Sequence, residues 1–384
     1  MNERHRQLSA ATISLAGTII GVGIFGIPYV IGQVGAIPAL VYFLVLGGVQ
    51  TLLHLFFAEA AIACPDIHGL PGLARVHLGS AAGRIGGVAL ILGYWASLTA
   101  YVAVGGTFLA IILRPVFGGG DPFYSLVWGI VGALIVRFGM RVFTRLETVG
   151  TVALILTLVG ILAVAVPHVR VANMPAWNLI DPVVPYGVIL FSLIGLSVIP
   201  EMKGMVKGRV GDYRWAVVVG TAIAAAVTMA FGFVVWGVVG HRVAKDAVSG
   251  LNDVLGAGIA VPVAVAGFLA VATSYLATAV NVRDSFHFDF RLSPTVAWLL
   301  AVSPPMAIFL FGGRDFLVMI GLSGAVFGGI LSVLVGLMYL KIRRQGLVSG
   351  KPLRVPAVFA YITILVLGIG AVVETWDYLG GLLS

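Results

Sequence analysis

The chain has 384 residues, of which 60% are hydrophobic and only 10% are charged. Soluble domains carry about 25% charged residues because they face water on all sides, so this composition indicates a membrane protein. The net charge is +8, but the basic residues lie in short loops between apolar segments, as in cytoplasmic loops rather than a nucleic-acid-binding surface. The single cysteine, Cys64, excludes an intramolecular disulfide and a multi-cysteine metal site.

The apolar segments are long enough for transmembrane helices, which need about 20 residues each. We therefore expect an all-α membrane protein with one domain over residues 1–384 and eleven transmembrane helices. Breakers or charges such as Pro65-Asp66 and Asp181-Pro182 separate the segments. The predicted spans are 9–34, 37–63, 84–114, 121–138, 146–168, 183–205, 214–241, 256–282, 294–312, 315–341 and 354–378.

The distribution of positive charge predicts the orientation of these spans. With the N-terminus in the cytoplasm, 18 of the 23 lysines and arginines fall on the cytoplasmic side, where membrane proteins concentrate them. Adding or removing one span would mix the two groups, so the charge pattern supports eleven. The C-terminus then faces outwards, and the expected location is the cytoplasmic membrane.

The first span has a weak point in its middle. Glycines at 17, 21, 23 and 26 precede Pro28, and in a helix interior glycine costs about 1 kcal/mol and proline about 3 kcal/mol relative to alanine. Unwound backbone inside a membrane must be buried in protein or line a cavity. We therefore expect this helix to break at Gly21-Val22-Gly23 and the break to face the protein interior.

The sixth span contains a second weak point between Phe191 and Glu201. Ser197 is expected to cap a restarted helix, and Pro200 fits its first turn. Spans one and six correspond if five helices are repeated, and the odd number inverts the second copy. The expected repeats are residues 9–168 and 183–341, with an extra helix at 354–378. Paired breaks at corresponding positions point to a transporter's binding site.

The chemistry of such a site follows from helix ends. A break exposes unpaired amides at one new end and unpaired carbonyls at the other. Amides attract a carboxylate, whereas carbonyls attract an ammonium group or a small cation, and an amino acid carries both charges. Gly23, Gly105 and Gly195 are expected to leave room for a large substrate side chain.

Several motifs resemble the amino acid–polyamine–organocation superfamily. The series from Gly21 to Phe25 with Pro28 is similar to its first-helix signature, and Val198-Ile199-Pro200-Glu201 is similar to its sixth helix. In the third span, Leu92-Gly93-Tyr94 with Tyr101 and Gly105-Gly106 is similar to the hydroxy and aromatic amino acid permeases and the amino acid/auxin permeases. Two further matches are Ala272-Thr273-Ser274-Tyr275-Leu276 and Ser303-Pro304-Pro305, which resemble helices eight and nine. The resemblance implies a leucine-transporter-type fold, with five-plus-five inverted repeats, and ion-coupled secondary transport of amino acids by alternating access.

The resemblance also implies the binding residues. The substrate carboxylate would bind the amides of Gly21, Val22 and Gly23, its amine would bind carbonyls at Phe191, Ser192 and Ile194 beside Gly195, and Tyr101 would approach from span three. A sodium ion would bind the carbonyls of Gly17, Ile20 and Ala270 and the hydroxyls of Thr273 and Ser274. Proton coupling stays equally open, although the fifth span lacks the lysine of some proton-coupled relatives. Apart from sodium no cofactor is expected, and the expected partners are the substrate, a coupling ion and the bilayer, without nucleic acid.

Other interpretations of these residues remain open. The glycines could serve close helix packing, and Thr273 and Ser274 could bond to their own helix. His54 is a candidate proton relay, while Glu201 with Lys203 is either a gate or an exposed helix-end pair. A passive channel or facilitator for a small solute is the alternative function, but no span shows the continuous polar stripe that a channel needs. A membrane enzyme is less favoured, because the sequence offers no nucleophile–base pair.

Overall fold

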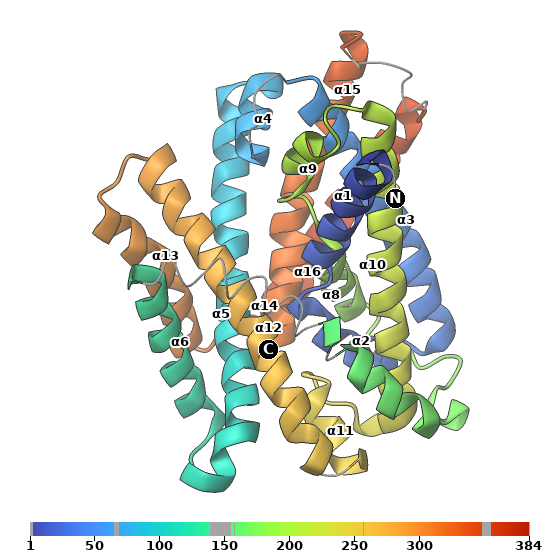
Figure 1. Cartoon of the computed structure of the whole chain (residues 1–384), viewed down its shortest axis with the longest axis vertical. Helices are drawn as coiled ribbons and strands as arrows, with labels where there is room; N and C mark the ends of the chain where they lie inside the picture. Colours follow the sequence, from blue (N-terminus) through green and yellow to red (C-terminus); the bar gives the residue numbers. More distant parts are fainter. Residues whose placement is uncertain are drawn as a thin grey trace.

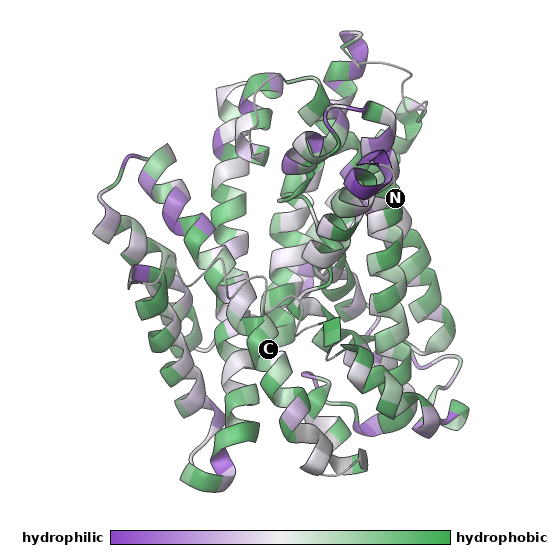
Figure 2. Cartoon of the chain, viewed as in Figure 1, coloured by the Kyte–Doolittle hydropathy of each residue, from purple (hydrophilic) through white to green (hydrophobic). Residues whose placement is uncertain are grey.

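The computed structural model describes residues 3–64, 69–138, 155–156, 158–255, 257–347 and 355–383, and every regular element in these ranges is helical. The helices form an elongated bundle (Figure 1) whose flanks are largely hydrophobic and whose hydrophilic residues gather toward its ends (Figure 2). Six described helices are long and apolar enough to cross a membrane, and the bent α1–α2 pair adds a seventh. The predicted all-α membrane architecture is confirmed.

The first half of the described chain follows the predicted spans one to four closely. The short helix α4 was not predicted. The fifth predicted span lies partly outside the described residues, and a shorter apolar helix at Leu158–His168 covers its second half, so the count of eleven stays a prediction. The elements are α1 (Glu3–Ile19), the 3-10 helix η1 (Val22–Gly26), α2 (Ile27–Val34), α3 (Ala36–Ile62), α4 (Leu70–Leu78), α5 (Ser80–Phe117), α6 (Asp121–Phe138), and the 3-10 turns η2 (Val166–His168) and η3 (Val171–Asn173).

The second half contains the predicted spans six to eleven and two short π-helices. The helix α11 was not predicted either. The elements are α8 (Val184–Leu193), α9 (Ile199–Met205), α10 (Val210–Val239), the 3-10 turn η4 (Gly240–Arg242), α11 (Val248–Leu255), α12 (Ala257–Asp284), the π-helix η5 (Ser285–Asp289), α13 (Pro294–Leu310), α14 (Phe316–Gly321), the π-helix η6 (Leu322–Phe327), α15 (Gly328–Arg344) and α16 (Ala357–Leu383).

Two groups of helices surround the broken ones. In the first group α5 packs against α4, α6, α12 and α13, and in the second α10 packs against α1, α2 and α3. Small residues allow the close approaches. An added Cβ at Gly132 of α6 would lie 2.6 Å from the Tyr275 ring of α12, and one at Gly232 of α10 would lie 2.5 Å from Ile27 of α2. The broken helices α1–α2 and α8–α9 are thus held by tightly packed long helices.

The turn between α2 and α3 is tight and is centred on Gly35. Gly35 adopts φ +91°, a conformation that residues other than glycine rarely take. Its neighbours are covered by a strap at 175–180, because the amides of Ala36 and Ile37 donate to the carbonyls of Pro175 and Ala176 at 2.9 and 3.0 Å. This strap closes one end of the bundle over the first broken helix.

Candidate substrate site at two broken helices

The first break separates α1 from α2, which meet at a bend of 47°. Gly21 lies in the gap with extended backbone, at φ −129° and ψ −158°. The amide of Ile20 still donates to Ala16 at 2.9 Å, and the amide of Ile24 donates to Gly21 at 3.2 Å. Within the described chain, the amides of Gly21, Val22 and Gly23 have no acceptor. The predicted break is confirmed, and three adjacent donors are left for a ligand.

The second break separates α8 from α9. Ile194 leaves the helix with extended backbone, and its amide donates to the carbonyl of Phe191 at 3.3 Å. The carbonyls of Ser192 and Ile194 accept no hydrogen bond from any described residue. This end therefore offers acceptors where the first break offers donors.

The predicted cap of the restarted helix is wrong. Pro200 lies in the first turn of α9 as expected, but the cap position is Val198, one residue after Ser197. Val198 is already in a helical conformation, and its carbonyl accepts from the amides of Glu201 and Met202. The Ser197 side chain is exposed and caps nothing in the structure, because the turn that precedes α9 starts the helix later.

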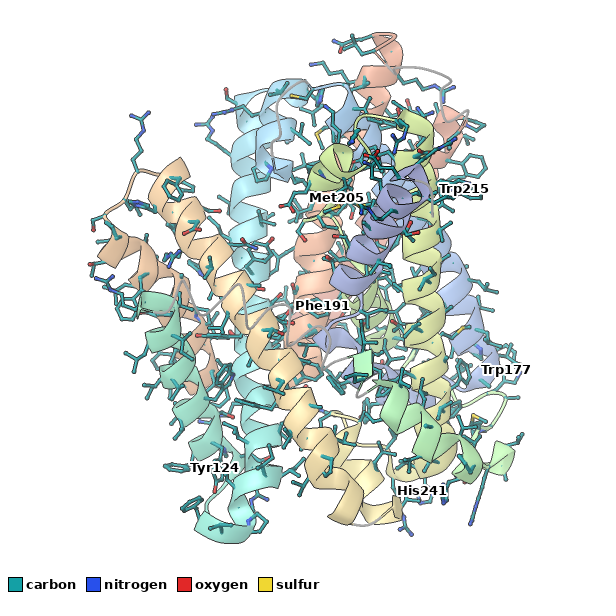
Figure 3. All side chains as sticks on the ribbon, in the orientation of Figure 1. Tyr124, Trp177, Phe191, Met205, Trp215 and His241 are labelled. Atoms are coloured by element: carbon teal, nitrogen blue, oxygen red, sulfur yellow. The ribbon has the colours of Figure 1, made fainter. Side chains whose placement is uncertain are left out.

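The two breaks touch each other near the middle of the molecule. An added Cβ at Gly23 would lie 2.5 Å from the Ser192 hydroxyl oxygen, and one at Gly195 would lie 2.7 Å from the Ile19 side chain. Figure 3 shows Phe191, the neighbour of Ser192, at mid-height between the two ends of the bundle. Free amides and free carbonyls are therefore brought into one region, where they can bind the two charges of an amino acid.

The expectation that three glycines leave room for a substrate side chain is wrong. Neighbouring side chains already fill the space at Gly23 and Gly195, and a Cβ at Gly105 would lie 2.7 Å from the Trp128 ring. These glycines serve close helix packing. Gly21 differs, because the atom nearest to its added Cβ is the Ile19 carbonyl oxygen at 3.9 Å. Among these four glycines, only Gly21 has open space at the Cβ position.

Two polar side chains of α3 hold the second break in place. The fully buried His54 accepts a hydrogen bond from the Gly195 amide at 3.1 Å through Nε2, and its Nδ1 lies 2.9 Å from the Thr221 hydroxyl of α10. One turn earlier, the buried Gln50 donates to the Leu190 carbonyl at 3.3 Å. We call His54 and Gln50 the α3 clamp.

The contacts of His54 fix its tautomer. The Thr221 hydroxyl donates to the Val217 carbonyl at 2.9 Å, so it can only accept from His54. Nδ1 therefore carries the proton, and Nε2 is free to accept from Gly195. The imidazole is neutral in this arrangement, and its two nitrogens join three different spans.

The break is more accessible from one end of the bundle than from the other. Residues 22–26 are all buried, whereas Gly21 is half-buried and Thr18 and Ser197 are exposed. The helix α12 packs against η1 but makes at most marginal contact with α1. The exposed residues beside the breaks thus belong to α1 and to the segment before α9, which lie toward the N-terminal end of the bundle (Figure 1), while the strap at 175–180 covers the turn between α2 and α3.

The sequence and the fold both have counterparts in known proteins. The sequence profile of the tryptophan/tyrosine permease family matches residues 4–376. The chain belongs to this family. The permease is similar to the tyrosine-specific transport system 1 of Haemophilus influenzae, with 23% identity over 359 residues, 87% of this chain and 88% of the relative being covered.

The architecture is similar to a solved transporter structure. The permease matches the structure described as the inward facing conformation of Mhp1 with a TM-score of 0.67 and 16% identity, over 97% of this chain and 90% of that chain. The resemblance to aromatic amino acid permeases and the leucine-transporter-type fold are thus confirmed. The protein is a multi-pass membrane protein and a secondary transporter of amino acids rather than an enzyme.

Tyr101 is a buried residue of α5 on the side that faces α12. Its side chain is 8% exposed and interacts with Thr278 of α12. Its carbonyl accepts from the Trp128 indole at 3.2 Å. Among the described residues no hydrogen bond joins Tyr101 to either break, so its approach to a substrate stays a prediction.

The residues predicted to bind sodium come from two helices. The Thr273 hydroxyl donates to the Ala270 carbonyl at 2.9 Å, which is the self-bonded arrangement considered above. Its oxygen lone pairs are still available to a cation. The carbonyls of Gly17 and Ile20 accept no hydrogen bond from any described residue. No hydrogen bond in the described chain joins Thr273 or Ser274 to these two carbonyls, so the cation site also stays a prediction.

Ionic side chains gather at the end of the permease that carries the N-terminus. Glu59 is fully buried, and its Oε1 accepts a hydrogen bond from Nε of Arg214 at 2.5 Å in an ion pair. Lys203 donates to the carbonyls of Ala61 and Cys64 at 3.1 and 2.7 Å, and so caps α3. Glu201 is exposed, whereas Lys203 is half-buried and bonded to α3, so an exposed helix end describes Glu201 alone and the gate stays a prediction.

Proposed function

We propose that this permease carries an aromatic amino acid across the cytoplasmic membrane by ion-coupled symport with alternating access. The single observation that carries the binding model is the row of unpaired amides at Gly21, Val22 and Gly23, buried or half-buried where two broken helices meet. Family membership and the tyrosine-specific relative support the aromatic substrate.

In the proposed complex, both charges of the substrate bind to backbone. The carboxylate accepts from the amides of the first break, and the ammonium donates to carbonyls at Phe191, Ser192 and Ile194 beside Gly195. A free helix end suits the two charges of an amino acid because its amides and carbonyls are already oriented and carry partial charges. Tyr101 contacts the aromatic side chain from α5.

The coupling ion in this proposal is sodium or a proton. Sodium would bind the carbonyls of Gly17, Ile20 and Ala270 with the hydroxyls of Thr273 and Ser274, because a hard cation prefers several oxygen ligands. The N-terminus faces the cytoplasm, the C-terminus faces out, and residues 9–168 and 183–341 form the inverted repeats, followed by the extra helix at 354–378. The gathering of the N-terminus, α9 and the basic end of α15 at one end supports this orientation (Figure 1).

Uptake into proteoliposomes tests the proposal directly. Labelled tyrosine, tryptophan and phenylalanine are compared with leucine and lysine under an inward sodium gradient, an inward proton gradient and no gradient. We expect aromatic amino acids to accumulate above equilibrium with one of the two ions. Uptake that equilibrates without accumulation under either gradient would instead identify a passive facilitator. The absence of binding and exchange for all aromatic substrates would refute the proposed substrate class.

The sodium site has its own test. Replacing Thr273 and Ser274 with alanine removes both hydroxyl ligands and should abolish any stimulation by sodium. Ser332→Ala is a matched control, because Ser332 is buried and bonds to the Gly328 carbonyl of its own helix at 2.6 Å. Unchanged sodium stimulation in the double variant would refute the proposed cation site.

A further inference from the structure

The last helix carries an acid that substrate binding does not use. Glu374 lies in the part of α16 that is apolar enough to cross a membrane. Its Oε2 atom is buried without a hydrogen-bond partner, and Glu374 forms no ion pair with any described residue. An ionised carboxylate is costly in such a place, so an intramembrane acid is expected to have a function.

Glu374 fills a notch where three helices meet. Its Oε1 atom would lie 2.8 Å from a Cβ added at Gly187 of α8, and 2.8 Å from one added at Gly321 of α14. The two glycines also face each other, because the Cβ at Gly187 would lie 2.8 Å from the Gly321 Cα. The carboxyl group therefore packs against the backbone of α8 and α14, and no described group donates to it.

A cavity connects this notch with the end of α8 that lies away from the N-terminus. The cavity has a volume of about 520 Å³ and is lined by Tyr42, Val183, Tyr186, Ile369 and Glu374, among others. Pro182, which also lines it, is exposed in the segment before α8. The cavity is lined mainly by apolar side chains of α8 and α16, and in the proposed orientation its Pro182 end is the outer end.

The groups around Glu374 do not neutralise it. The charged groups that act on it are Asp377 of its own helix and Asp181, which accepts from the first amides of α8. Of the tyrosines, Tyr186 donates its hydroxyl to carbonyls of α16 at 3.3 and 3.4 Å, and Tyr42 donates to Pro182 at 2.6 Å. A proton is therefore a more suitable ligand than a metal ion, which would need several oxygen ligands with free lone pairs.

The notch lies about one helical turn from the second break along α8. Phe191 lies one helical turn after Gly187 on α8, and an added Cβ at Gly324 of η6 would lie 2.7 Å from the Phe191 amide nitrogen. The helices α8 and η6 thus pack closely from the notch to the break. If the distance between α16 and α8 changed at Gly187, the carbonyls that the substrate amine is proposed to bind would be displaced.

We propose that Glu374 is a proton-binding site that controls closure of the outer half of the permease. A proton from the outer aqueous phase converts the carboxylate to the neutral acid, which packs in the notch and holds α8, α14 and α16 together. Loss of the proton restores an unpaired charge in the notch, which favours separation of α16 from α8 and α14. The proposal rests on the orientation and transport activity proposed above.

The test compares the wild type with E374Q, which has the same shape and cannot ionise. Both are reconstituted, and aromatic amino acid exchange and net uptake are measured while the outer pH is varied over about three units around neutrality. We expect wild-type net uptake to change about tenfold over this range and E374Q to be nearly independent of outer pH. Exchange by E374Q should stay within about twofold of the wild type. The control D121N, a half-exposed acid that is not among the groups acting on Glu374, should follow the wild type.

Two outcomes would overturn the proposal. One is a wild-type pH profile in E374Q, and the other is loss of exchange by E374Q at every pH, which would show a purely structural role. Thermal unfolding of the purified proteins gives a readout that needs no substrate. The wild type should lose stability relative to E374Q as pH rises, because only its carboxyl group ionises. Parallel pH dependence of the two melting temperatures would refute the site even if the proposed substrates proved wrong.

Discussion

The two breaks release the same kinds of backbone group but differ in what their neighbours do with them. At the first break, three successive amides from Gly21 to Gly23 have no acceptor in the described chain. At the second break, the Gly195 amide is bound to His54 and the Leu190 carbonyl to Gln50. One break is left open for a ligand, whereas the other is partly occupied by a neighbouring helix.

This difference shows how a broken helix can be rigid and still bind a ligand. Unpaired backbone groups in a membrane cost several kcal/mol each, so those that do not serve binding should be satisfied by the protein. The α3 clamp does this at the second break and fixes the direction in which α8 ends. The carbonyls of Ser192 and Ile194 are then presented at a defined place opposite the free amides of the first break.

The largest effect is expected from filling the space at the first break. Gly21→Leu suits the extended backbone at this position, and the added side chain meets no atom closer than 3.9 Å at its Cβ. It should occupy the volume that a carboxylate needs. We expect substrate affinity to fall about 100-fold, which is about 2.7 kcal/mol. Direct binding of labelled tyrosine and tryptophan to the purified protein measures the change.

The control for this variant is Gly48→Leu. Gly48 lies on α3 with no atom within 4 Å of an added Cβ, so the same side chain is added at a glycine far from the break in the sequence. Gly48→Leu should bind substrate normally. Normal affinity in a folded Gly21→Leu protein would contradict the amide site.

The next largest effect is expected from the α3 clamp at His54. Asparagine at this position can place a donor near the Nδ1 position and keep the bond to Thr221, whereas glutamine can place an acceptor near the Nε2 position and keep the bond to Gly195. His54→Asn leaves the buried Gly195 amide unpaired, which costs about 1–3 kcal/mol. We expect transport by His54→Asn to fall about tenfold, while His54→Gln retains most of it.

Function and stability should separate in this pair of variants. The Gly195 amide is a positioning contact, so its loss should reduce the transport rate and the affinity for the substrate amine more than protein yield or melting temperature. Equal transport by the asparagine and glutamine variants would show that the bond to Gly195 is irrelevant.

A smaller effect is expected where the breaks touch. In Gly23→Ala the new methyl group would lie 2.5 Å from the Ser192 hydroxyl oxygen and 3.0 Å from the Ser192 Cα. Overpacking of this kind typically costs about 1–3 kcal/mol. The melting temperature should fall, and Ser192→Gly in the same chain should recover part of the loss because it removes the closer contact. Additive losses in the double variant would show that the two residues do not meet.

The sequence predicted the large features of this molecule because they depend on composition and on strong helix breakers. The break at Gly21 and the turn at Gly35 follow from glycine and proline, whose effects are local. The α3 clamp was missed as a unit, although polar residues at 50 and 54 on one face of an apolar helix are a readable signal. Their partners, the Leu190 carbonyl and the Gly195 amide, depend on how α3 packs against α8, which local pattern does not specify.

The glycines show the same limit. Gly21 and Gly23 look alike in the sequence, and both were expected to belong to the substrate site. Packing separates them, because Ser192 fills the space beside Gly23 and nothing fills the space beside Gly21. Which glycine faces a ligand and which faces a helix is decided by the neighbouring span, more than 150 residues away in the chain.

The smallest effect is expected at the other half of the clamp. Gln50 donates to the Leu190 carbonyl at 3.3 Å, but its own Oε1 atom is buried without a partner. Gln50→Leu removes a long hydrogen bond and an unsatisfied acceptor together, and such paired losses are nearly neutral. We expect a change in unfolding free energy below about 1 kcal/mol and transport within about threefold of the wild type. A loss as large as that of His54→Asn would mean that both halves of the clamp position the break. In that case the free carbonyls after Leu190 would depend on Gln50 as much as on His54.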